Sequence, residues 1–323
     1  MPVPKVSIAM PVRNAAAYLP LSLGSIFAQT FSDWELLLFD DGSDDESLAI
    51  LHRLPGSRIR IFYDKRNLGG AARRNQLISE ARGEYIAYID ADDLMHPARI
   101  EMQLAFLDRY PDVSGVGCAM IVLDEGLRPV GVRKFPVTHA EICARPLRGI
   151  SLAHPTFVSR TSWWKQRRYN EANRYCEDWE LWSSAYESSQ FANLVEPLYF
   201  YRQFSSFSLQ REIAARLTIS SLQWKRRARF GWIAAASACM AEYARCGVIA
   251  TACTLGRKDW LFRRRSLPID AKTAALYSSA LPKIIHSATE LFGKEAVPAS
   301  LLEECGAGAG TNVNSSSPQA STA

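Results

Sequence analysis

A strand that runs straight into acids is the feature that most constrains this chain. Residues 83–97 read GEYIAYIDADDLMHP, and the β-branched and aromatic run over 85–89 predicts a buried strand. Asp90, Asp92 and Asp93 follow it directly. Clustered carboxylates repel one another unless a cation lies among them, and oxygen ligands suit Mg²⁺ or Mn²⁺. The alternative is an acidic turn, in which Asp92 or Asp93 caps a helix that begins near Pro97.

The same order of strand and then acid occurs earlier in the chain. Residues 34–47 read WELLLFDDGSDDES, with a predicted strand over 34–39 that leads into Asp40 and Asp41. Further strands are expected over 6–10, ended by Pro11, and over 58–63. Helical segments separate these strands, the first with Asn14 as its N-cap. This alternation predicts an α/β fold with a doubly wound, mainly parallel sheet flanked by helices.

The loops that follow the four strands should meet, because the carboxyl ends of parallel strands lie at one edge of a sheet. These loops contain Pro11, Asp41, residues 67–70 and residues 90–93. The repeated pattern favours a ligand site over a helix cap. The chain has no GxGxxG after its first strand and no GxxxxGK[ST], which argues against dinucleotide and P-loop sites. A bound diphosphate would then be neutralised by a metal rather than by a glycine-rich loop.

A third acidic cluster lies in YCEDWELWSSA, residues 175–185, where Glu177 and Asp178 lead an apolar helical pattern. Acids at a helix N-terminus are stabilised by the helix dipole, which alone would explain them. The functional interpretation is a carboxylate that takes a proton from an incoming hydroxyl.

The last third of the chain differs in charge from the rest. Residues 211–265 contain twelve Lys and Arg against three Asp and Glu, beside Trp224, Phe230 and Trp232. Basic residues next to Trp and Phe suit an anionic membrane surface. The alternatives are a solvated basic helix and a nucleic-acid patch, but no nucleic-acid fold motif accompanies the charge, so no nucleic-acid partner is expected.

The cysteines and the N-terminal residues indicate in which cellular compartment the protein is expected. The chain has seven cysteines and no CxxC pair, which predicts free thiols in a reducing cytosol. Cys239, Cys246 and Cys253 recur every seven residues and are expected to be buried along one helical stripe. No signal peptide is expected at the N-terminus. The chain has no run of about 18 uncharged apolar residues, so no membrane span is expected.

Several motifs in this order resemble the inverting family 2 glycosyltransferases with the GT-A fold. The resemblance spans about residues 4–208 and is carried by VSIAMPVRNAAAYLP, WELLLFDDGSDD, NLGGAARRN, GEYIAYIDADD and CEDWELW. It implies a GT-A-type nucleotide-sugar domain over 1–208. The remaining composition predicts a basic, helical C-terminal extension over 209–304 and a disordered tail over 305–323.

The resemblance implies a role for each candidate residue. The nucleotide would be held by Pro11, Arg13, Asn14, Asp41, Asn67, Gly69 and Arg74. Asp92 would be the direct metal ligand, with Asp90 nearer the ribose or a metal-bound water, and Asp93 would stay structural as a helix cap. Asp178 would be the general base, with Glu177 beside it. The family commonly has a His after its Tyr-Arg pair, but Phe204 stands there in this chain. His154 is a candidate substitute, although a His before Pro is ordinarily structural.

The expected function follows from these roles. It is a metal-dependent (Mn²⁺ or Mg²⁺) inverting transfer of a sugar from a nucleotide-sugar, with UDP as the expected nucleotide. The acceptor is expected to be a hydroxyl of a glycan or lipid-linked molecule in polysaccharide or cell-envelope synthesis. The alternatives are an inactive sugar-nucleotide-binding protein and a nucleotidyltransferase of similar fold. The expected location is the cytoplasm, with peripheral contact at the inner face of the membrane through 209–265.

Overall fold

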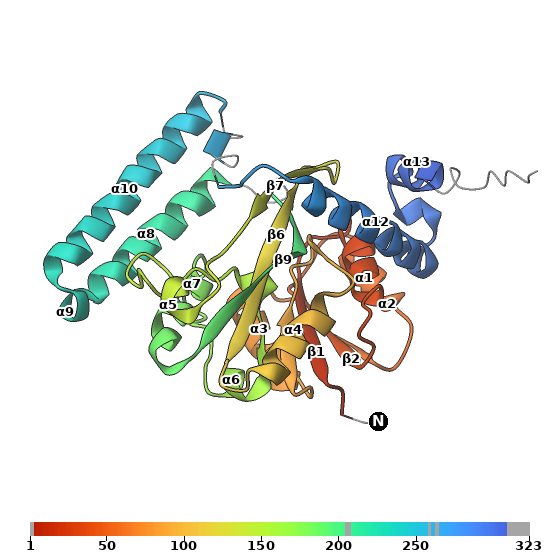
Figure 1. Ribbon diagram of the computed structural model, residues 1–323, viewed down its shortest axis with the longest axis horizontal. Coiled ribbons are helices and arrows are strands. Elements are labelled where there is room, and N and C mark those ends of the chain that lie inside the picture. The colour runs from red at the N-terminus through yellow and green to blue at the C-terminus, as the bar shows by residue number, and fades with distance from the viewer. Residues whose placement is uncertain (1–2, 204–207, 258–259, 262–264, 309–323) are drawn as a thin grey trace, which may run out of the picture.

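A mixed β-sheet runs through the molecule and positions the loops that carry the acids (Figure 1). The computed structural model describes residues 3–203, 208–257, 260–261 and 265–308, with no side-chain description for 304–308. Within these residues nine strands form the sheet: β1 (Val6–Val12), β2 (Trp34–Asp40), β3 (Ile59–Tyr63), β4 (Tyr85–Tyr88), β5 (Leu94–Met95), β6 (Gly115–Leu123), β7 (Pro129–Arg133), β8 (Val158–Arg160) and β9 (Phe191–Arg202).

The strand order is β3-β2-β1-β4-β8-β6-β9-β5, and β7 pairs with β6. The first four strands in this order are all parallel, as the alternation of strands and helices predicts. In the other half of the sheet β6 and β9 are also parallel, whereas β8, β5 and β7 each pair antiparallel with their neighbours, so the sheet as a whole is mixed. The turn between β6 and β7 is too short for a crossover helix, so the chain must reverse there.

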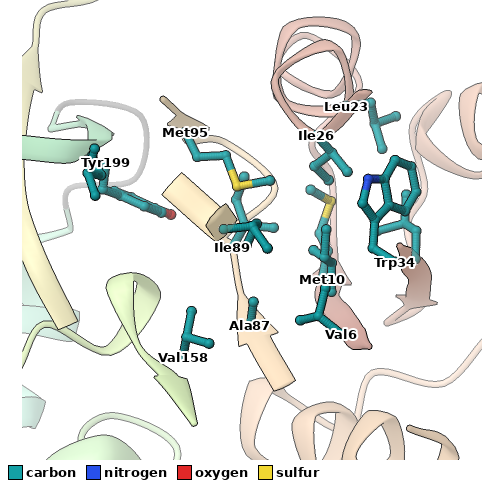
Figure 2. Close-up of a cluster of buried hydrophobic side chains, with 14 of the residues drawn as sticks. Val6, Met10, Leu23, Ile26, Trp34, Ala87, Ile89, Met95, Val158 and Tyr199 are labelled. Carbon is teal, nitrogen blue, oxygen red and sulfur yellow. The ribbon is translucent and has the colours of Figure 1, made fainter. Parts of the chain in front are cut away.

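The helices within the first 203 residues cover both faces of this sheet. They are α1 (Leu19–Phe27), α2 (Ser47–His52), α3 (Gly70–Glu80), α4 (Arg99–Arg109), α5 (His139–Ile142), α6 (Thr161–Lys165) and α7 (Glu177–Ala185). One apolar core joins β1, β2 and β4 to α1 and α4, and Figure 2 shows Met10, Ile26 and Trp34 within it. A second core, rich in Trp and Tyr, lies on the opposite face and includes side chains of α3, α6 and α7.

Two expectations near the first strand are wrong. β1 does not stop at Pro11 but continues to Val12. The pairing of β1 with β4 ends at Ala9. Pro11 lies beyond it, so its missing N–H removes no hydrogen bond between β1 and β4. Asn14 is not the N-cap of α1, whose N-cap is Tyr18. Instead, Asn14 adopts a left-handed conformation with φ 48° in the loop before it.

The C-terminal part consists of a helical hairpin and a helix that joins the core. Its helices are α8 (Leu209–Lys225), α9 (Arg227–Phe230), α10 (Trp232–Thr254), α12 (Ala271–Phe292) and α13 (Ala299–Gly308). In Figure 1, α8 and α10 lie side by side and project from the sheet, with α9 at the far end. Buried Glu242 of α10 pairs with Arg216 of α8 at 3.3 Å, which ties the two helices together.

Helix α12 belongs to the core of the molecule, unlike the hairpin. Its apolar face packs with Leu21 of α1 and with Ile121 and Phe200 of the sheet. The Tyr277 hydroxyl donates to the Leu127 carbonyl at 2.6 Å. The domain boundary at 208 stays a prediction, but residues 271–292 fold against what precedes it. Of the expected tail, 305–308 belong to α13 and 309–323 lie outside the described residues.

Helix α10 bears on two further expectations. The thiols of Cys239, Cys246 and Cys253 are partly exposed rather than buried, because α10 packs mainly against α8. In the described part of the chain, α10 is also long and apolar enough to cross a membrane by length and composition, although the expectation was of no such segment. Within the molecule, 22% of the most apolar stretch of α10 is buried.

The contact between α1 and α12 generates a test of the fold. A Cβ at Gly24 would lie 2.7 Å from the Ile284 carbonyl oxygen and 2.8 Å from the Ala288 Cβ. We expect Gly24→Ala to lower the free energy of unfolding by about 1–3 kcal/mol, because the overpacking outweighs the better helix propensity of Ala. Urea unfolding followed by Trp fluorescence measures this change. Gly247→Ala is the control, because that helical glycine has no atom within 4 Å of the added Cβ. A Gly24→Ala protein as stable as the wild type would contradict the tight contact.

Candidate active site

The loops at the carboxyl ends of the parallel strands meet around one cavity of about 870 Å³, as the sequence predicts. Every residue expected to hold the nucleotide or the metal lines it, namely Pro11, Arg13, Asn14, Asp41, Asn67, Gly69, Arg74, Asp90 and Asp92. We call this the strand-edge cavity. Residues of the C-terminal part complete its wall, among them Ser208, Arg211 and Arg265.

The loops after β1 and β2 are fastened to each other. The Asp44 N–H donates to the Asn14 Oδ1 at 3.0 Å, and the Asn14 N–H donates to the Ser43 Oγ at 3.1 Å. Asn tolerates the left-handed conformation of this position better than most residues. The backbone around Arg13 and Asn14 is therefore held in place by the protein itself.

Asp41 connects three elements at the base of the strand-edge cavity. Its carboxylate accepts from the N–H groups of Leu68 and Gly69, at 2.8 and 2.9 Å, and from the Arg73 Nε at 2.7 Å. Gly69 has φ 89°, a conformation that favours glycine. A carboxylate has about four acceptor positions, so Asp41 retains room for one more donor.

Arg73 is a residue of this site that sequence reasoning missed. Its side chain is fully buried, and its Nη2 pairs with Asp64 at 2.6 Å while its Nε holds Asp41. The guanidinium carbon also lies 4.1 Å from the centre of the Phe39 ring. Hydrogen bonds from Arg73 keep the pKa of Asp64 well below its ordinary value. The only signal in the sequence is that two arginines are adjacent, which on a helix sends them about 100° apart.

Arg74 points towards the acids instead. Its Nη1 pairs with the Glu177 Oε1 at 2.7 Å, and its Nη2 lies 3.5 Å from the Asp90 Oδ1. Arg74 thus links the end of β4 to the start of α7, which lie far apart in the sequence. Burial opposes its charge, but Asp90 and Glu177 more than compensate and raise its pKa.

Asp90 and Asp92 form the carboxylate pair of the strand-edge cavity. Burial and the charge of Asp92, against the opposing effect of Arg74, raise the pKa of Asp90 to about 6. Two neighbouring carboxylates with this net negative charge are a donor set that suits a divalent cation. Among the described residues, no group of three or more His, Cys, Asp or Glu is arranged to hold a metal. Mg²⁺ commonly needs only one or two carboxylates when substrate phosphates supply other ligands.

Asp93 is structural, but it does not cap a helix. Its carboxylate accepts from the Tyr199 hydroxyl and from the Arg202 N–H, both at 2.8 Å. Helix α4 begins at Arg99, with Ala98 as its N-cap and no side-chain capping bond. The expected cap is therefore wrong: Asp93 is buried and fastens the end of β9 to the loop after β4, a pairing that the local sequence could not reveal.

Asp178 lies in a second cavity of about 430 Å³, which we call the Asp178 cavity. Arg133, Tyr201 and Arg265 line both cavities, so the two adjoin. Burial raises the pKa of Asp178, and the neighbouring charge of Glu177 raises it further. A carboxylate with a raised pKa is a better proton acceptor when ionised than an ordinary aspartate.

His154 is a structural residue by its contacts. It is buried, its Nε2 lies 2.5 Å from the Tyr169 hydroxyl, and its ring packs against Tyr88 and Trp182. Burial holds its pKa well below the ordinary value, so the ring is neutral. It lines the Asp178 cavity. Phe204, at the position where a His is common in the resembling family, lies outside the described residues.

Comparisons with known proteins find a matching family profile and similar sequences. The profile of "Glycosyl transferase family 2" matches residues 7–181. EpsE of Bacillus subtilis, named as a glycosyltransferase, is 37% identical over 62% of this chain and 74% of its own length. The UDP-Glc:alpha-D-GlcNAc-diphosphoundecaprenol beta-1,3-glucosyltransferase WfgD of Escherichia coli is 35% identical over 42% of this chain and 66% of its own length.

Solved structures share the fold at low identity. TarS 1-349 of S. aureus in complex with UDP-GlcNAc has a TM-score of 0.57 at 19% identity, with 88% of this chain and 81% of that chain covered. The mannosyltransferase PcManGT from Pyrobaculum calidifontis, in complex with GDP-Man and Mn²⁺, has a TM-score of 0.54 at 15% identity, with 90% and 88% covered.

Proposed function

The chain belongs to glycosyl transferase family 2, and from this premise we propose that it moves a sugar from a nucleotide-sugar to an acceptor hydroxyl with inversion at the anomeric carbon. It is a glycosyltransferase with a GT-A-type fold. One observation carries the proposal. The acids at the ends of β2 and β4 line one cavity, and Asp178 lies in an adjoining cavity behind a shared wall.

The expected donor is a UDP-sugar, held in the strand-edge cavity. A base that presents an imide N–H would find an acceptor in the one remaining position on Asp41. Arg13, Asn14 and Asn67 line the same space. The names of WfgD and of the TarS complex include UDP-sugars, which supports this nucleotide, whereas that of the PcManGT complex includes GDP-Man.

Asp90 and Asp92 would hold a divalent cation, Mn²⁺ or Mg²⁺, with Asp92 as the more direct ligand. When bound, such an ion would offset the negative charge on the departing nucleotide diphosphate. The carboxylate oxygens fit this role because burial and the charge of Asp92 both disfavour the ionised form of Asp90, and a nearby positive charge favours it. Arg74 supplies part of that charge from the protein itself.

Asp178 would act as the general base. It would accept the proton of the acceptor hydroxyl while the oxygen attacks the anomeric carbon from the face opposite the diphosphate. A single displacement of this kind inverts the configuration and needs no covalent intermediate. Glu177, held by Arg74, would lie beside Asp178 and orient the start of α7.

The first prediction concerns Asp178. Asp178→Asn should bind UDP normally but lose about 10²–10⁴-fold in transfer, because the amide cannot accept the proton. Nucleotide release from a panel of UDP-, GDP- and dTDP-sugars measures turnover and also identifies the donor. Asp112→Asn, an exposed aspartate, is the matched control. Wild-type turnover in the Asp178 variant would refute the assignment. A wild-type protein that binds UDP without releasing nucleotide from any of these donors would be an inactive binding protein.

The second prediction concerns the metal. Asp92→Ala should weaken UDP binding at least about tenfold in the presence of Mn²⁺ and leave the weaker metal-free binding unchanged. Titration calorimetry with and without EDTA measures both. Asp178→Asn serves as the comparison, because it should keep the metal-dependent affinity. Equal affinities for wild type and Asp92→Ala in Mn²⁺ would show that Asp92 is not a ligand.

The expected setting is cell-envelope or polysaccharide synthesis in the cytoplasm, with the protein at the inner face of the membrane. The α8–α10 hairpin supports this setting. Trp232, Ile233 and Met240 are 65–69% exposed, and Trp224 and Trp260 are also exposed. Arg227 lies in α9, which joins α8 to α10 (Figure 1), whereas Arg229 of the same helix is ion-paired with Glu187. Apolar and basic side chains together fit an anionic lipid surface.

The third prediction tests this contact. The double substitution Trp232→Glu and Ile233→Glu should weaken binding to vesicles of phosphatidylglycerol and phosphatidylcholine at least about tenfold, because it removes apolar contact and adds repulsion. Co-sedimentation with the full-length protein measures it. Val195→Glu, a 62% exposed position on β9, is the control. Wild-type protein that ignores anionic vesicles would contradict the contact.

A further inference from the structure

More cations than acids line the Asp178 cavity. Its described lining includes Arg133, Lys134 and Arg265 against a single acid, Asp178. The other titratable groups of the lining, His154 and Tyr201, are neutral at physiological pH, because burial lowers the pKa of His154 and raises that of Tyr201. No ion pair involves these three cations within the described part of the chain. The three positive charges repel one another unless an anion lies between or against them.

Arg133 and Arg265 lie close together because the backbone segments that carry them pair with each other. The chain returns from the hairpin and pairs with β7 through Val132 and Leu267, whose backbone groups exchange hydrogen bonds of 2.8 and 2.9 Å. A Cβ at Gly131 would lie 2.6 Å from the Ser266 Cβ, so the glycine permits this close approach. The pairing places Arg265, next to Ser266, beside Arg133 at the end of β7.

Arg133 has few partners of its own. Its Nη2 donates to the Gln203 Oε1 at 2.6 Å, its guanidinium lies 5.1 Å from the centre of the Tyr201 ring, and its buried Nε has no hydrogen-bond partner. Burial lowers the pKa of Arg133, and the charge of Arg265 also lowers it, against the opposing effects of Tyr201 and Asp93. A bound anion would relieve both lowering effects, and Arg is well suited to one because its planar fork matches phosphate geometry.

We propose that the Asp178 cavity binds an acceptor that carries a phosphate group, with Arg133, Lys134 and Arg265 as its anion site. The inference rests on the proposed function and names the class of the acceptor. Phe135, Leu152 and Pro155 supply an apolar part of the same wall, which suits a sugar face or an alkyl chain beside the phosphate. Asp178 lines the same cavity, so a hydroxyl on the group attached to the phosphate would share the cavity with the proposed base.

The donor's own diphosphate is the other source of the same chemistry, since Arg133 and Arg265 also line the strand-edge cavity. Lys134 separates the two sources because it lines only the Asp178 cavity. The probes are n-octyl phosphate and the uncharged n-octyl glucoside, titrated below their micelle concentrations into full-length protein saturated with UDP and Mn²⁺. The variants are Lys134→Gln and Arg265→Gln, with Arg128→Gln, an exposed arginine in the β6–β7 turn, as the control.

We expect octyl phosphate to bind the wild type and Arg128→Gln alike, more tightly than octyl glucoside. Each of the other two variants should weaken octyl phosphate about 10- to 100-fold, the size of a lost charge-assisted hydrogen bond, and Lys134→Gln should leave UDP affinity unchanged. No preference for the phosphate in the wild type would overturn the inference. So would a loss of UDP affinity in both variants, which would assign the cations to the donor.

These outcomes are separate from those that test the enzyme. If Asp178-dependent release of nucleotide persists while octyl phosphate fails to bind, the anionic acceptor is refuted and the glycosyltransferase assignment stands. If neither UDP nor any nucleotide-sugar binds, the proposed function itself fails.

Discussion

The buried ion pairs of Arg73 hold the donor side of the molecule together. Arg73 connects Asp41 at the end of β2 with Asp64 after β3, and Asp41 in turn holds the 68–69 backbone before α3. Removing one partner of a buried pair typically costs about 3–5 kcal/mol, because the other charge is left without compensation. The loops that we propose to bind the nucleotide therefore depend on Arg73, whose own side chain does not line the strand-edge cavity.

The neighbouring residue, Arg74, connects the acids of the strand-edge cavity in a similar way. One residue further along α3, Arg74 lies between Asp90 and Glu177 and offsets some of the charge that they accumulate. Two consecutive positions on one helix thus connect the base pocket, the carboxylate pair and the start of α7. This arrangement keeps the acids of three separate elements close together before any substrate is bound, so little reorganisation is needed when it arrives.

The sequence predicted the features that depend on local order. Apolar strands followed directly by Asp41 and by Asp90 indicated the edge of the sheet, and every expected ligand residue there lines one cavity. Features that depend on partners distant in the chain were not predictable. Asp93 resembles a helix cap until β9 brings Tyr199 against it, and Arg133 is an ordinary strand residue until the segment at 265–267 returns to pair with β7. Exposure of the α10 thiols likewise depends on how little of the molecule covers that helix.

Cations line both of the adjoining cavities, but the balance of acids differs between them. The strand-edge cavity has four acids, Asp41, Asp90, Asp92 and Glu212, among its six arginines, whereas the Asp178 cavity has Asp178 alone against Arg133, Lys134 and Arg265. An anionic ligand in the Asp178 cavity therefore meets fewer opposing carboxylates. Arg265 lines both cavities and follows the α8–α10 hairpin in the chain. The proposed membrane contact and the proposed anion site would thus both draw on basic residues from the last third of the chain.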